Sequence, residues 1–116
     1  MKLKPAKENY GIKFIRVDQN KNLEIEANID NLFTTNRSTS LKKNNIEIHT
    51  VEHILAAISG NQIDNVVIEI DNKEIPILDG SSKEFCEKIE EIGVKQQHAT
   101  RQYFEISRKI VLEDKN

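Results

Sequence analysis

The residue types best suited to chemistry gather in one short segment, His49-Thr50-Val51-Glu52-His53. Imidazole nitrogens bind zinc, and a nearby carboxylate can take a proton from a water molecule that the metal activates. Read as H-x-x-E-H, the segment matches the inverted-zincin motif of some metallopeptidases. That motif requires His49 and His53 to lie on the same face of one helix.

The sequence around the segment argues against this helical pair. Residues 46–48 alternate apolar and polar side chains as a strand does, and the Thr50 hydroxyl is suited to cap a helix that starts after it. His49 would then precede the helix, and Glu52 and His53 would share its first turn. Both of these side chains could reach a cleft that opens above the helix N-terminus.

A single histidine is too few for a catalytic zinc ion, which takes three protein ligands. The local sequence therefore leaves three interpretations open. The segment is an inverted zincin, or Glu52 and His53 belong to a zinc site that residues from elsewhere complete, or both residues are structural. In the structural interpretation, the Glu52 carboxylate favours the positive end of the helix dipole.

Two helices are predicted from apolar residues that recur every three or four positions. The apolar face of the first consists of Val51, Ile54, Leu55 and Ile58. Gly60 is expected to end this helix in a left-handed conformation, and Ala56 and Ala57 are expected off its apolar face. The second helix is expected to begin with a capping box of Ser81 and Glu84. Its apolar face consists of Phe85, Ile89 and Ile92.

The other apolar segments are short, which is typical of strands. Strands are predicted in residues 12–17, 23–27, 46–48, 66–70, 75–77, 103–106 and 110–112. Residues 35–41 are polar and indicate either an edge strand or an irregular loop. Strand runs joined by short turns favour an α+β fold, a two-layer sandwich of a mostly antiparallel sheet with two helices on one face.

Composition narrows the class of protein. The 116 residues suit a single domain, and 17 Lys and Arg against 19 Asp and Glu give a net charge of −2. Without a basic excess, no nucleic-acid partner is expected. No apolar run is long enough for a transmembrane helix, and the first residues lack the apolar core of a signal peptide. The single cysteine, Cys86, suits a reducing compartment, so a cytoplasmic protein is expected.

A specific resemblance extends over most of the chain. It rests on residues 3–16, on residues 50–57 with the motif TVEH, on residues 63–70, and on residues 74–81 with the sequence EIPILDGS. At this separation the segments resemble the UDP-3-O-acyl-N-acetylglucosamine deacetylases. The resemblance implies a zinc-dependent amide hydrolase of lipid A biosynthesis, with Zn²⁺ as cofactor and UDP-3-O-acyl-N-acetylglucosamine as substrate.

The resemblance also implies roles for two residues of the TVEH motif. His53 is expected to be a zinc ligand, and Glu52 is expected to be the catalytic general base that takes a proton from water. His49 matches no ligand of the family and receives no role. Residues 35–40 could approach the active site, but none of them matches a family motif well enough for a role to be assigned.

A longer enzyme is implied as well. Residues 1–116 resemble its N-terminal domain, without the family's first strand and without a second domain that carries two further zinc ligands and a catalytic histidine. That second domain is expected to pack on the helices, where Ala56 and Ala57 would admit a close contact. The chain alone is therefore expected to be inactive. The alternatives are a piece of an inverted-zincin metallopeptidase and a non-catalytic α+β interaction domain.

Overall fold

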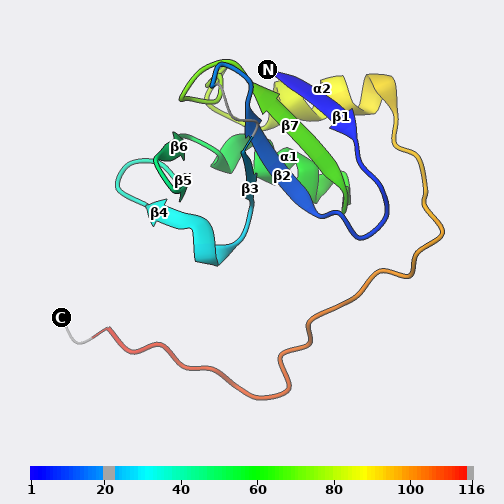
Figure 1. Ribbon diagram of the computed structural model, residues 1–116. Coiled ribbons are helices and arrows are strands. Elements are labelled where there is room, and N and C mark those ends of the chain that lie inside the picture. Colours follow the sequence, from blue (N-terminus) through cyan, green and yellow to red (C-terminus); the bar gives the residue numbers. More distant parts are fainter. Residues whose placement is uncertain (20–22, 115–116) are drawn as a thin grey trace.

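The N-terminal strands belong to the larger of two sheets in the described part of the chain (Figure 1). The structure is a computed structural model that describes residues 1–19 and 23–114. The larger sheet has the order β1-β7-β2-β3. Its strands are β1 (Lys2–Pro5), β2 (Ile12–Arg16), β3 (Glu24–Glu26) and β7 (Val66–Ile70). β2 and β7 are parallel, whereas β1 pairs with β7 and β3 pairs with β2 in antiparallel register.

The smaller sheet is antiparallel and has the order β4-β5-β6. Its strands are β4 (Leu32–Thr34), β5 (Ser40–Lys43) and β6 (Ile46–Ile48), and the short 3-10 helix η1 (Ile29–Asn31) leads into it. The strand predicted in residues 46–48 is thereby confirmed. Residues 35–39 form the loop between β4 and β5, so the polar segment is partly loop and partly strand.

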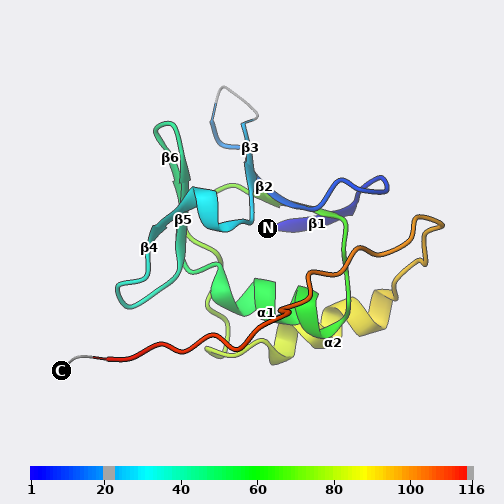
Figure 2. The ribbon, with the colours of Figure 1, turned by 90° about the horizontal axis from the view of Figure 1, so that it is seen from below.

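Two helices, α1 (Glu52–Gly60) and α2 (Lys83–Ile92), lie on the same side of the larger sheet (Figure 2). The predicted α+β fold, with mostly antiparallel strands and helices on one face, is confirmed. The parallel pairing of β2 with β7 was not predicted. The connection between these strands runs through the smaller sheet and α1, and it is long enough for the crossover that parallel strands need. Neither helix in the described residues has the length and apolarity to cross a bilayer.

The hydrophobic core lies between the larger sheet and the helices. Phe14 and Ile68 are register partners on neighbouring strands, and both are fully buried in one cluster with Ile54 of α1. Ala57 is also fully buried, so the expectation that it lies off the apolar face is wrong. It follows Ile54 by three positions and therefore falls on the same side of the helix. Ala56 is exposed, as expected.

Removing a core side chain should destabilise the fold strongly. Ile68→Ala is expected to lower the free energy of unfolding by about 2–5 kcal/mol, because the mutation leaves a cavity where a fully buried side chain packed. Ile92 is 85% exposed, against the prediction that it belongs to the apolar face of α2. Ile92→Ala should therefore cost about 0.5 kcal/mol or less. Urea unfolding of the two variants checks this, and equal losses would contradict the placement of the core.

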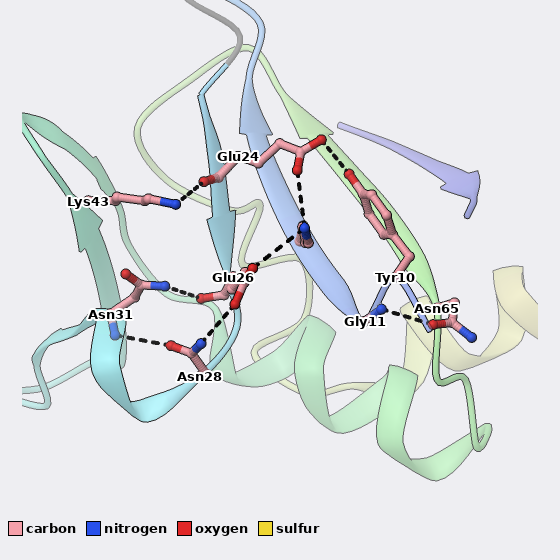
Figure 3. A network of polar contacts seen from close by, with 9 residues as sticks. Tyr10, Gly11, Glu24, Glu26, Asn28, Asn31, Lys43 and Asn65 are labelled. Carbon is pink, nitrogen blue, oxygen red and sulfur yellow. Dashed lines mark hydrogen bonds and ion pairs between the residues drawn. The ribbon is translucent and has the colours of Figure 1, made fainter. Parts of the chain in front are cut away.

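Polar contacts join the two sheets along β3 (Figure 3). The Lys43 ammonium of the smaller sheet donates to the backbone carbonyl of Glu24 at 3.2 Å. The Asn31 side-chain amide donates to the backbone carbonyl of Glu26 at 2.9 Å, and the Asn28 side chain accepts from the Asn31 backbone N–H. These bonds use carbonyl groups of an edge strand, so they fix the smaller sheet against the larger one.

Three segments predicted as strands form none. Residues 75–77 do not pair as a strand, and Pro76 cannot donate to a ladder because it has no backbone N–H. The preceding residue, Glu74, makes an isolated parallel bridge with His49. Residues 103–106 and 110–112 lie in an extended tail that leaves the body of the fold (Figure 1). A strand needs a neighbouring backbone to pair with, and the described residues place none beside this tail.

The helix ends also differ from the predictions. Gly60 is the last residue of α1 and does not have the predicted left-handed conformation. The N-cap of α2 is Ser82, whose side chain makes no capping hydrogen bond. The Ser81 hydroxyl instead donates to an Asp79 carboxylate oxygen at 2.8 Å, so the predicted capping box of Ser81 with Glu84 does not form.

Candidate active site

The start of α1 differs in detail from the predicted cap. Helix α1 begins at Glu52, and its N-cap is Val51, which supplies no side-chain hydrogen bond. Thr50 precedes the cap with a φ of 61°, in the left-handed region, and is 5% exposed. Its hydroxyl donates to a Glu74 carboxylate oxygen at 2.7 Å. The prediction that Thr50 caps the helix is therefore wrong, because its hydroxyl is bound to a different segment of the chain.

The loop between β4 and β5 contacts Glu52 directly. The backbone N–H of Thr39 donates to Glu52 Oε2 at 2.9 Å, and the Thr39 carbonyl accepts from the Val51 backbone N–H at 3.1 Å. Among the described residues, no other hydrogen bond or ion pair engages the Glu52 carboxylate. One carboxylate oxygen is thereby held in place while the other remains available to take a proton.

His53 follows Glu52 in the first turn of α1 and is half-buried. In the described part of the chain, no hydrogen bond or ion pair engages its imidazole. An imidazole without a polar partner retains a nitrogen lone pair for a metal ion, and imidazole is a common zinc ligand. The structure therefore places a potential zinc ligand and a potential general base next to each other at the same end of the helix.

His49 lies outside α1, in a separate set of polar contacts. Its Nδ1 is 2.8 Å from the hydroxyl oxygen of Ser40, and its Nε2 is 3.4 Å from a carboxylate oxygen of Glu47. His49 and His53 therefore do not form the helical pair that the inverted-zincin motif requires. Nor do the described residues contain any group of three His, Cys, Asp or Glu side chains arranged to hold a metal ion.

Glu47 connects His49 to two lysines. Its carboxylate oxygens lie 2.9 Å from Lys73 Nζ and 2.9 Å from Lys42 Nζ. Hydrogen bonds from Lys73 and then Lys42 lower the pKa of the Glu47 carboxyl from 4.5 to about 2, because both favour its charged form. The carboxylate therefore holds this set of contacts together at neutral pH.

The depressed pKa of Glu47 predicts a pH dependence of stability. Its stabilising contribution is fully present above the ordinary pKa of 4.5, and it is lost as the pH falls towards about 2. Glu47→Gln should therefore be less stable than the wild-type protein at pH 6 and should lose less of its stability on acidification. Urea unfolding at a series of pH values measures this difference. Parallel pH profiles for the two proteins would contradict the prediction.

Sequence reasoning assigned no role to two residues whose contacts hold the start of α1. Thr39 and Glu74 each lie more than ten positions from the residue they bind, so no local spacing could point to them. The backbone of the 73–75 segment also holds His49, which donates to the Lys73 carbonyl at 2.9 Å and accepts from the Ile75 N–H at 3.1 Å. The candidate site is thus built where two distant segments meet the first turn of one helix.

Comparison with known proteins shows that the sequence is similar to one family. A family model described as UDP-3-O-acyl N-acetylglycosamine deacetylase matches residues 1–116. The chain is 43% identical over 112 residues to the UDP-3-O-acyl-N-acetylglucosamine deacetylase of Methylococcus capsulatus, covering 97% of the chain and 37% of the relative. It is 42% identical, with the same coverage, to the protein of that name from Cellvibrio japonicus. The protein of that name from a Nitratiruptor species is 36% identical over 114 residues. The chain therefore spans little more than a third of the length of these relatives.

Proposed function

The chain belongs to the UDP-3-O-acyl N-acetylglycosamine deacetylase family, and on that premise we propose that it is the N-terminal part of a zinc-dependent deacetylase. The whole protein would remove the N-acetyl group from UDP-3-O-acyl-N-acetylglucosamine, in the cytoplasm, as a step of lipid A biosynthesis. The observation that carries the proposal is the first turn of α1. There Glu52 is held by the Thr39 backbone, and the His53 imidazole next to it has no polar partner among the described residues.

His53 and Glu52 would have different roles in the reaction. His53 would bind zinc through a ring nitrogen, and Glu52 would take a proton from the attacking water through the carboxylate oxygen that Thr39 leaves free. Zinc, when bound, supplies Lewis-acid chemistry that lowers the pKa of water and polarises an amide carbonyl. Holding one Glu52 oxygen limits the orientations of the carboxylate, which favours proton transfer in a fixed geometry.

The remaining zinc ligands and a catalytic histidine would come from a second domain. The exposed apolar residues of the C-terminal tail support such a partner. They are Tyr103, Phe104, Ile106, Ile110, Val111 and Leu112, each at least 62% exposed. We propose that residues 103–106 and 110–112 become strands once the second domain supplies a neighbouring backbone. The exposed Ala56 on α1 would allow that domain to approach the helix closely.

Zinc-dependent acetate release tests the proposal. The full-length protein should release acetate from UDP-3-O-acyl-N-acetylglucosamine, lose this activity on removal of zinc by a chelator, and regain it when zinc is restored. A protein that contains stoichiometric zinc and releases no acetate would contradict the assigned reaction. Full activity in a preparation shown to be free of zinc would contradict the assigned metal.

The isolated 116-residue chain should bind zinc weakly and show no deacetylase activity. One imidazole cannot replace a site with three protein ligands, and the described residues supply no cluster that could complete one. Calorimetric titration of the chain with zinc should show binding weaker than micromolar. Micromolar or tighter binding would instead support a complete metal site within these residues.

A further inference from the structure

Thr50 has a backbone conformation that its residue type disfavours. Its φ is 61°, and a β-branched residue at positive φ is an outlier because the side chain crowds the backbone. Such a conformation persists only where surrounding contacts impose it. Thr50 lies two positions before Glu52, so its conformation sets the direction in which the chain enters α1.

Glu74 supplies the side-chain contact to Thr50. The Thr50 hydroxyl donates to Glu74 Oε1 at 2.7 Å, and Thr50 is only 5% exposed, so water has little access to replace this bond. A hydrogen bond to a charged acceptor is stronger than one between neutral groups. The parallel bridge between His49 and Glu74 brings the two backbones together just before this point. The bridge involves backbone atoms only, whereas the Glu74 carboxylate binds the Thr50 side chain itself.

Thr39 supplies further contacts to the start of α1. Its backbone binds both the Val51 N–H and the Glu52 carboxylate. No side chain caps α1 at Val51, so the first turn depends on these two outside segments for its position. Losing the Glu74 contact would release Thr50 from the left-handed region and let the first turn shift relative to Thr39.

We propose that Glu74 is a positioning residue for the reaction: it holds Thr50 in the left-handed conformation that places Glu52 and His53. This inference rests on the proposed function. Glu74 itself takes no part in proton transfer or metal binding. A change at Glu74 should therefore affect turnover more than substrate affinity, because a small displacement of a catalytic group slows the chemical step.

Steady-state kinetics of the full-length protein test this role. Glu74→Ala should lower kcat by about 10- to 100-fold while KM changes by about twofold or less. Glu74→Gln should restore most of kcat, since the amide oxygen still accepts from the Thr50 hydroxyl. Asp71→Asn is the matched control, because it neutralises an exposed carboxylate three positions before Glu74 and should leave kcat unchanged. Unchanged kcat in a folded Glu74→Ala variant would overturn the proposal.

Kinetics in a Thr50→Gly background distinguish a positioning role of Glu74 from direct participation in the reaction. Glycine adopts positive φ without steric cost, so Thr50→Gly removes the need for the Glu74 contact. Adding Glu74→Ala to Thr50→Gly should therefore lower kcat by about twofold or less, well short of its effect alone. The full loss in both backgrounds would mean that Glu74 acts on substrate or metal, and would overturn the proposal.

Amide hydrogen exchange provides a readout that does not need activity. Glu74→Ala should speed exchange of the amides of residues 52–55 at the start of α1, while the amides of β7 keep wild-type rates. Unchanged exchange at the start of α1 would overturn the positioning role. If the wild-type protein released no acetate, the proposed function would fail, and the exchange measurement would still decide whether Glu74 holds the turn.

Discussion

His53→Ala in the full-length protein should remove most of the bound zinc and nearly abolish acetate release. His53 lies in the first turn of α1 and has no polar partner in the described residues, so its imidazole is free for a metal ion. Loss of one of three protein ligands weakens a zinc site severely. The zinc-to-protein ratio after dialysis, measured on the preparation used for kinetics, gives the result.

His49→Ala is the matched control for this prediction. His49 bonds the fully buried Ser40 hydroxyl, and its loss leaves that hydroxyl without its partner. The expected cost is about 1–3 kcal/mol of unfolding free energy, with the zinc content unchanged. An inverted zincin would lose zinc equally in both variants, because each histidine would be a ligand. Comparable zinc loss in both would therefore contradict the role given to His53.

The spacing of apolar residues within a segment predicted the helices and strands that depend mainly on their own residues. The strand predicted in residues 66–70 is confirmed as β7, where Val66, Ile68 and Ile70 are buried. The recurrence of apolar residues predicted α1, and helical spacing alone would have placed Ala57 beside Ile54 in the core. Ala57 was wrongly predicted to lie off the apolar face because that face was defined by the largest side chains alone.

Contacts between distant segments could not be predicted in this way. Thr50 is a good cap by residue type, but its hydroxyl binds Glu74, which lies 24 positions further along the chain. Likewise, nothing in the polar sequence around Thr39 indicates that its backbone binds Glu52. The residues proposed for chemistry were thus identified from the TVEH motif, whereas the groups that hold them emerged only from the fold.

The C-terminal tail shows a different limit of predicting strands from sequence. The apolar residues in 103–106 and 110–112 are typical of strands, yet they are exposed and unpaired in this chain. Strand propensity reflects packing against neighbours and burial, so it predicts a strand only where a partner exists. Because no strand forms in either segment, the residue types alone did not decide the structure of the tail.

Glu52→Ala in the full-length protein should lower kcat by about 100-fold or more and leave zinc bound. Proton transfer by a positioned general base contributes about 10²- to 10⁴-fold to rate, and this contribution is lost with the carboxylate. Because His53 retains its place in α1, the metal should stay. Zinc content and turnover measured on the same preparation test both parts, and near-normal turnover would make Glu52 a structural residue.

Glu52→Gln separates the base from the hydrogen bond that holds it. The glutamine amide oxygen can still accept from the Thr39 N–H, which lies 2.9 Å from Oε2 in the wild-type chain, but the side chain can no longer take a proton. We expect Glu52→Gln to lose nearly as much activity as Glu52→Ala. Thr39→Ala keeps the backbone donor and should stay close to the wild-type rate. If glutamine restored turnover, the importance of Glu52 would lie in holding the β4–β5 loop, and the general base would have to be another residue.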